Sequence, residues 1–258
     1  MTRHSTRGIP PLLAAASLLL TACSDDTPAA TPQQSLSTPS SGATDATTQD
    51  PTDGPTGPGP GWSLLEDEAD GVPLEAGSYG LTANGVSEHI AVIRAPEGYQ
   101  RYGGWTFVTG EPFRAMGYLT ADLVPRDPCG SAAHSKFDTE VDPGPAVADL
   151  AEALVAQKGA VTSTPVPVTL DGHQGLYLTY QVGKGIDVPQ CEAQAFDIFS
   201  TGPGAWYLEA ARERAAIWIL DVDGDRVVLA WVAVPGVTQA QLREMTRMVR
   251  SAHFVDPR

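Results

Sequence analysis

The sequence predicts an α+β fold: a mostly antiparallel β-sheet flanked by two or more helices, in a single domain that follows a disordered segment. Three observations predict it. Short runs rich in β-branched and aromatic residues recur along residues 62–258, bounded by Gly, Pro or Asp. Two Asp-Gly pairs separate neighbouring runs, and only two stretches show helical spacing of apolar residues. Because strands follow strands instead of alternating with helices, we expect antiparallel pairing.

Eight runs are expected to form strands, because each is short, rich in β-branched or aromatic side chains and bounded by turn residues. They are residues 90–94, 105–109, 116–124, 161–169, 175–182, 196–199, 217–222 and 227–234. Asp171-Gly172 and Asp223-Gly224 each join two neighbouring runs. Since Asp-Gly accommodates the positive φ angles of a tight turn, we expect a β-hairpin at both places.

Residues 146–158 and 239–251 are expected to form helices. Their apolar faces consist of Val147, Leu150, Leu154 and Val155 in the first and of Leu242, Met245, Met248 and Val249 in the second. Gly159 follows the first stretch directly, as is common where a helix ends. Thr238 and Gln241 have the spacing of a capping box at the start of the second.

The first 22 residues have the layout of a signal peptide. Arg3, His4 and Arg7 form a basic head, and an apolar run follows over residues 12–20. A membrane-spanning helix needs about 20 apolar residues, so this run is too short to cross a bilayer. We therefore expect residues 1–22 to be removed on export.

The segment Leu20-Thr21-Ala22-Cys23 resembles the lipobox of bacterial lipoproteins, with the basic head and apolar run placed as in that family. The resemblance implies cleavage before Cys23 and a thioether-linked diacylglycerol on its sulfur. Two acyl chains hold a protein on a bilayer where one gives only marginal binding. The protein is then expected to be anchored to the cell membrane on the extracytoplasmic face. The alternative is an ordinary secretory signal with a chance cysteine.

Residues 23–61 are expected to form a disordered tether that begins at the lipidated Cys23. Residues 24–61 are rich in Thr, Pro, Ser and Gly, with Leu36 as the one large apolar residue. Such a stretch buries too little apolar surface to offset the conformational entropy lost on folding. Residues 62–258 are long enough for one globular domain.

The charge of the chain opposes nucleic acid as a partner. Asp and Glu number 31 against 16 Lys and Arg, which gives a formal net charge of −15. A surface that binds a phosphate backbone is normally basic. We therefore expect no nucleic-acid partner.

From about residue 85 onward, the order of elements resembles the PsbP/Mog1-like domains of actinobacterial lipoproteins. The shared features are Pro96-Glu97-Gly98-Tyr99 before Trp105, a helix followed by a strand, the hairpin at Asp171-Gly172, and a later hairpin with a terminal helix ending at Ser251-Ala252-His253-Phe254. The resemblance implies a sheet flanked by helices and binding of a ligand or partner more often than catalysis. It transfers no binding residue, and the pair Cys129 and Cys191 departs from that fold.

Cys129 and Cys191 are the thiols that remain once Cys23 is acylated. Outside the cytoplasm disulfides persist, so we expect the two to be joined. Two alternatives stay open: a reactive cysteine working with His134, or two free buried thiols.

No linear motif of catalysis is present, and the sequence predicts no catalytic residue, metal or cofactor. The GxSxG, HExxH, GxGxxG and P-loop patterns are absent. Asp221, Asp223 and Asp225 surround a turn but lack the spacing of an EF-hand loop, so a hairpin is expected there rather than a calcium site.

Tyr99, Tyr102 and Trp105 form the densest aromatic group, which is either core packing or the lining of a groove for a small apolar ligand or a glycan.

Two functions remain open for the protein. The favoured one is a non-enzymatic, membrane-anchored lipoprotein that binds a small ligand or an envelope protein, including an accessory or sensor role in a membrane complex. The other is an envelope hydrolase whose groups converge only in the fold.

Overall fold

The computed structural model describes residues 61–83, 88–130, 140–201 and 204–257. All of them belong to one compact unit. The predicted signal peptide, the lipobox with Cys23, the tether up to residue 60, and His134 lie outside the described residues.

The described residues are mostly β, with two α-helices and two short 3-10 helices, where the sequence analysis expected α+β. The strands are β1 (Ser63–Leu64), β2 (Gly77–Thr82), β3 (Ile90–Ala95), β4 (Gln100–Tyr102), β5 (Thr106–Thr109), β6 (Arg114–Leu119), β7 (Val124–Pro125), β8 (Glu140–Val141), β9 (Ala160–Thr162), β10 (Val166–Leu170), β11 (His173–Val182), β12 (Phe196–Thr201), β13 (Gly204–Leu208), β14 (Arg214–Val222), β15 (Asp225–Ala233) and β16 (His253–Val255). The helices are η1 (Leu65–Asp67), α1 (Val147–Val155), η3 (Val188–Gln190) and α2 (Gln239–Arg250).

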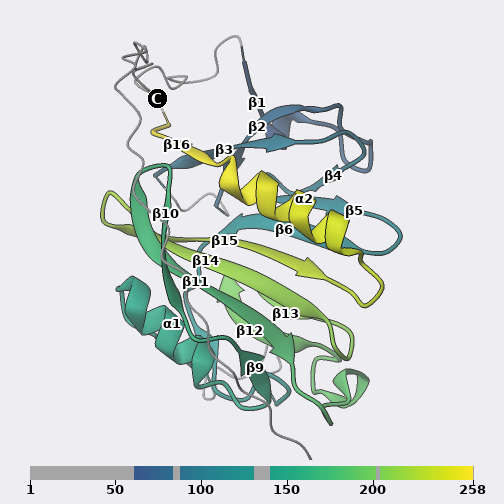
Figure 1. Ribbon diagram of the computed structural model, residues 1–258, viewed down its shortest axis with the longest axis vertical. Helices are drawn as coiled ribbons and strands as arrows, with labels where there is room; N and C mark the ends of the chain where they lie inside the picture. The colour runs from purple at the N-terminus through teal and green to yellow at the C-terminus, as the bar shows by residue number, and fades with distance from the viewer. Residues whose placement is uncertain (1–60, 84–87, 131–139, 202–203, 258) are drawn as a thin grey trace, which may run out of the picture. The chain divides into compact units, whose positions relative to one another are not determined.

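One large antiparallel sheet forms the centre of the fold (Figure 1). Its strand order is β10-β11-β14-β15-β6-β5-β4, and β9 also pairs with β11. Both predicted hairpins are confirmed: Leu170 pairs with His173 and Val222 with Asp225 across two-residue turns. The turn residues have positive φ angles, as Asp-Gly turns require.

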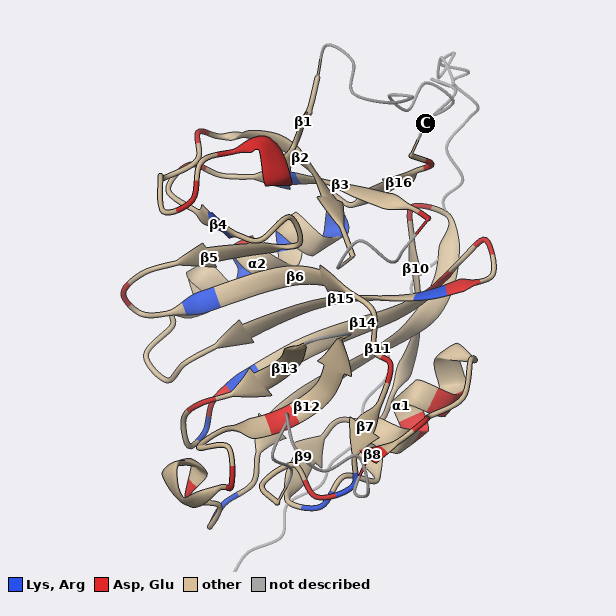
Figure 2. Ribbon diagram, turned by 180° about the vertical axis from the view of Figure 1, so that it is seen from behind, with Lys and Arg blue, Asp and Glu red and all other residues tan. Residues whose placement is uncertain are grey.

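The large sheet is buried on both faces, and this explains why its central strands read as unbroken apolar runs. In β14, Trp218 and Leu220 belong to the core on one face, and Ile217 and Ile219 belong to the core on the other. The first face is covered by α2 and by the small sheet β1-β2-β3-β16, and the second by α1 and the β12–β13 hairpin (Figures 1 and 2).

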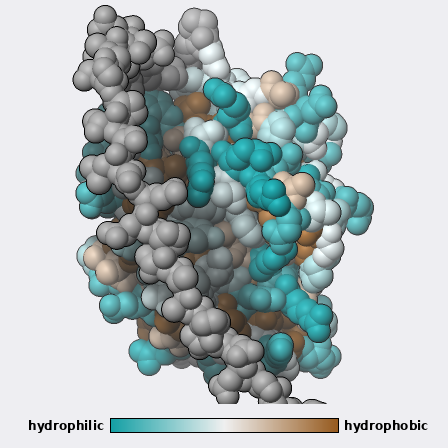
Figure 3. All heavy atoms as spheres, viewed as in Figure 1, coloured by the Kyte–Doolittle hydropathy of each residue, from teal (hydrophilic) through white to brown (hydrophobic). Residues whose placement is uncertain are grey.

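Helix α2 matches its prediction closely. The capping box is present: Gln241 N donates to Thr238 Oγ1 at 3.3 Å, and Thr238 N donates to Gln241 Oε1 at 2.8 Å. The predicted apolar face is buried against the large sheet. On the outward side of α2, hydrophilic side chains predominate (Figure 3).

Helix α1 ends earlier than predicted, at Val155, whose side chain is exposed. The cause is the buried side chain of Gln157. Its amide donates to Pro125 O at 2.8 Å and Ile198 O at 2.9 Å, and its Oε1 accepts from the Tyr180 hydroxyl at 2.8 Å. These three hydrogen bonds satisfy the polar atoms of a side chain that is buried in the core. Their partners lie on β7, β11 and β12, and the backbone leaves the helix where the side chain turns toward them.

The predicted disulfide is present between Cys129 and Cys191, with a Cα–Cα distance of 4.5 Å. The link joins the segment after β7 to the end of η3. Beside it, Glu192 N donates to Cys129 O at 2.9 Å. The two segments are therefore held together by a covalent bond and a backbone hydrogen bond.

Candidate ligand-binding site

Exposed aromatic side chains gather at one place on the described surface. Three large aromatic residues among those described are exposed: Tyr102 at 64%, Phe113 at 41% and Tyr207 at 43%. All three line a single pocket of about 460 Å³. Folded proteins bury most of their large aromatic surface, so a cluster of this kind is a candidate for a binding surface.

The pocket is lined by residues of the β4–β6 part of the large sheet and of β13, with the turn that follows β13. Tyr102 ends β4, Trp105 lies in the turn to β5, and Phe113 directly precedes β6. Trp206 and Tyr207 come from β13, which pairs with β12 and not with the large sheet. The aromatic lining is thus assembled from segments about 100 residues apart in the sequence.

The rings of this lining contact one another edge to face. The centroids of Tyr102 and Trp105 lie 6.1 Å apart, and those of Trp105 and Trp206 lie 6.4 Å apart. Such pairs contribute about 0.5–1.5 kcal/mol each beyond the burial of their area. The three rings therefore support one another as a wall of the pocket.

Two glycines make room for this wall. Gly103 has a φ of +62°, and a Cβ there would lie 2.5 Å from Trp105 Nε1. At Gly117 of β6, a Cβ would lie 3.2 Å from the Trp206 ring and 3.1 Å from Thr106 Oγ1. A side chain at either position would displace a tryptophan of the pocket.

Two carboxylates complete the lining, both from the turn between β13 and β14. Glu209 is exposed, whereas Glu213 is only 2% exposed. Glu213 Oε2 accepts hydrogen bonds from Glu209 N at 2.6 Å and Ala210 N at 3.0 Å, which fixes the turn. Burial raises the pKa of Glu213, and these two N–H groups oppose the rise.

The raised pKa of Glu213 predicts a pH-dependent stability. A carboxyl group with a raised pKa binds its proton more tightly in the folded state, so the free energy of unfolding falls as pH rises from the ordinary value of 4.5 through the folded value. Glu213→Gln keeps the acceptor for the two N–H groups and removes the charge. The variant should therefore gain stability relative to wild type between pH 4 and pH 8, as measured by urea unfolding. A difference that stays constant with pH would contradict this, and Glu209→Gln is the control for losing one charge.

The structure separates the three aromatic residues that the sequence grouped together. Tyr102 and Trp105 line the pocket, but Tyr99 is 1% exposed and packs in the core on the opposite face of the sheet. Its ring meets Phe107 edge to face, and its hydroxyl donates to Glu244 Oε1 at 3.1 Å. Burial raises the pKa of Tyr99 to about 12. Tyr99 is therefore a core residue and not part of the groove predicted for it.

Sequence reasoning missed Phe113, Trp206, Tyr207 and the two glutamates of this pocket. The signal available in the sequence was the adjacent aromatic pair Trp206-Tyr207. Because successive side chains of a strand point to opposite faces, one of the two rings had to lie on the face away from the other.

Aspartates at both hairpins contact histidines. Asp171 contacts His253 Nδ1 at 2.8 Å and accepts from Phe254 N at 2.8 Å, while Asp225 lies 3.5 Å from His89 Nε2. Within the described residues, no group of His, Cys, Asp and Glu is arranged to hold a metal ion. Asp171 thus attaches β16 to the β10–β11 hairpin of the large sheet, and Asp225 contacts the residue that precedes β3.

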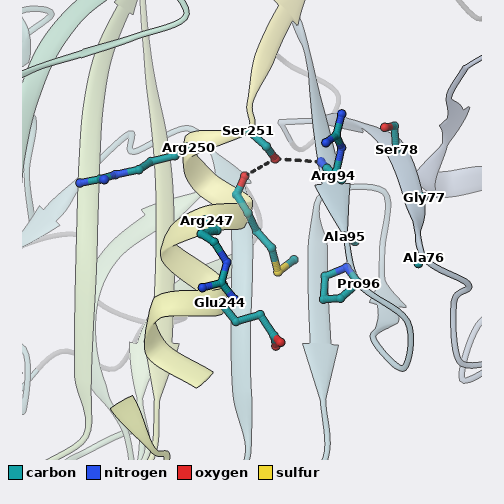
Figure 4. Close-up of a pocket in the computed structure, with 11 residues that line it drawn as sticks. Ala76, Gly77, Ser78, Arg94, Ala95, Pro96, Glu244, Arg247, Arg250 and Ser251 are labelled. Atoms are coloured by element: carbon teal, nitrogen blue, oxygen red, sulfur yellow. Dashed lines mark hydrogen bonds between the residues drawn. The ribbon is translucent and has the colours of Figure 1, made fainter. Parts of the chain in front are cut away.

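A second cleft, of about 720 Å³, lies between β2–β3 and the C-terminal turn of α2 (Figure 4). Small residues such as Ala76, Gly77 and Ala95 line it, and Ser251 Oγ accepts from Arg94 N at 2.9 Å. Figure 4 shows Arg250 pointing away from Arg94, so the arginine side chains at this cleft do not converge on one point. The aromatic pocket is therefore the better candidate for a ligand site.

No helix among the described residues is long and apolar enough to cross a membrane. No protein-family model matches the chain, and no curated protein is significantly similar to it.

Proposed function

We propose that this chain is a lipid-anchored extracytoplasmic protein that binds a small ligand in the pocket lined by Tyr102, Phe113 and Tyr207. The observation that carries the proposal is the convergence of these three exposed aromatic side chains on one pocket. Covering exposed apolar surface stabilises a complex by about 25 cal/mol per Å². A pocket of about 460 Å³ is in the size range of small-molecule sites.

Two features of the chain support an extracytoplasmic location for this function. The lipobox-like segment ending at Cys23 would hold the domain at the membrane, and residues 24–61 would let it stand clear of the lipid headgroups. The disulfide between Cys129 and Cys191 fits an oxidising compartment. The proposal therefore combines a membrane anchor, a spacer and a binding domain.

The pocket can be tested with the neutral fluorescent probe N-phenyl-1-naphthylamine. We expect its emission to rise with the full-length wild type, and its affinity to fall at least about tenfold in Tyr102→Ala/Tyr207→Ala, because each truncation removes about 1 kcal/mol or more of aromatic contact. Both side chains are exposed, so the fold should persist. The control is Val161→Ala, an exposed apolar residue outside the pocket. Equal binding by the double variant and the control would refute the assignment.

A further inference from the structure

We propose that the aromatic pocket selects an organic cation, a ligand whose ammonium group is attached to an apolar body. This inference rests on the proposed binding function and names its ligand class. Two properties of the lining support it: the sign of its charges and the number of its aromatic rings.

The charge of the lining has one sign. Glu209 and Glu213 both line the pocket, and none of its described lining residues is Lys, Arg or His. An anionic ligand would meet two carboxylates without a compensating cation. The resulting electrostatic repulsion costs free energy, which the burial of apolar surface would have to offset. A cation would be attracted by both groups.

The two carboxylates also differ in depth, because Glu209 is exposed and Glu213 is buried. Glu209 is therefore accessible to a cation arriving from solvent, whereas Glu213 acts on a cation in the pocket mainly through its charge. The hydrogen bonds found for Glu213 among described residues engage Oε2 alone. A carboxylate has about four lone-pair positions, so Glu213 retains the capacity to accept from a ligand.

The aromatic rings add attraction for positive charge. Five line the pocket, from Tyr102, Trp105, Phe113, Trp206 and Tyr207. The face of an aromatic ring carries negative charge density, and indole attracts cations most strongly. Since rings contribute from both the β4–β6 side and β13, an ammonium group inside the pocket would meet aromatic surface on more than one side.

A glycan is the competing ligand class. The lining carries donors for sugar hydroxyl groups on Tyr102, Thr106 and Tyr207, and on the indole N–H groups of Trp105 and Trp206. The two carboxylates favour the cation, because they add an attraction for positive charge that a neutral sugar lacks.

The test compares four probes by isothermal titration calorimetry on the full-length protein: benzyltrimethylammonium, neutral benzyl alcohol, anionic benzenesulfonate and the disaccharide cellobiose. We expect benzyltrimethylammonium to bind at least about tenfold more tightly than benzyl alcohol, since cation–π contacts and a carboxylate together contribute more than about 1.4 kcal/mol. Benzenesulfonate should not bind. Raising the salt concentration should weaken binding of the cation only, because screening acts on charge.

The variant Glu213→Gln should lower the affinity for benzyltrimethylammonium about five- to tenfold more than it lowers that for N-phenyl-1-naphthylamine, because the lost charge attracts only the cation. If this variant fails to fold, Glu209→Gln, altered at an exposed side chain, provides the same comparison with a smaller expected loss. Equal binding of benzyltrimethylammonium and benzyl alcohol, or preferred binding of cellobiose, would overturn the cation assignment and leave the binding function standing. Failure of every probe, the naphthylamine included, would overturn both.

Discussion

Replacing Cys23 with alanine is expected to move the protein from the membrane fraction into the medium. The sulfur of Cys23 is the predicted attachment point of the diacylglycerol, and two acyl chains account for stable attachment where one chain gives marginal binding. Fractionation followed by immunoblotting measures the shift, and intact-mass analysis of the wild type should show a mature chain that begins at Cys23 with added lipid mass.

Ser24→Ala is the matched control, because it changes the neighbouring residue and keeps the thiol. This variant should stay with the membrane like the wild type. A wild-type protein that starts at another residue, or that carries no lipid mass, would contradict the anchor. The ligand pocket would then still be testable on a secreted protein.

Removing the disulfide with Cys129→Ala/Cys191→Ala is expected to lower the free energy of unfolding by up to about 4 kcal/mol. The two cysteines are separated by 62 residues, and the entropy of the unfolded chain increases when a loop of this length is opened. That loop contains α1 and strands β8 to β11, so its opening frees a large part of the fold. Cys191 is also buried, and its truncation removes packing from the core around α1.

Urea unfolding of the wild type and the double variant measures this loss. Wild type treated with reductant is the control, because it breaks the same bond and keeps both side chains. The variant and the reduced protein should lose similar stability. If the urea concentration at the midpoint of unfolding is unchanged in both the variant and the reduced protein, the disulfide does not constrain the unfolded chain.

Local sequence signals predicted the elements whose residues interact with near neighbours. The turn at Asp223-Gly224 and the capping box of Thr238 with Gln241 depend on contacts within about three residues. Their geometry is therefore encoded in the segments themselves. The apolar runs of β14 and β15 also predicted strands, and successive side chains of these strands lie in the two cores on opposite faces of the sheet.

Sequence signals failed to predict the ends of strands and helices where a contact with a distant residue overrides the local conformational preference. Residues 161–169 were expected as one strand, but Ser163, Thr164 and Pro165 separate β9 from β10, and the two strands each pair with β11. Proline has no N–H to donate to a ladder, which favours a break at this point. Helix α1 stops before Gln157 because that side chain bonds to three other elements, a set of partners invisible in the local pattern.

Residue order and composition were sufficient for the acidic balance, the two Asp-Gly hairpins and the pairing of Cys129 with Cys191, because each depends on neighbours in the chain or on simple counting. The export signal and the lipid-attachment motif stay predictions. The pocket arose only from folding. Tyr99 and Tyr102 are three residues apart, yet the sheet puts one in its core and the other at the pocket. Trp206 contacts Trp105 only because the β12–β13 hairpin packs on the face of a sheet to which it is not hydrogen-bonded as a strand. Side-chain packing between layers set that position, and no periodicity along the chain records it.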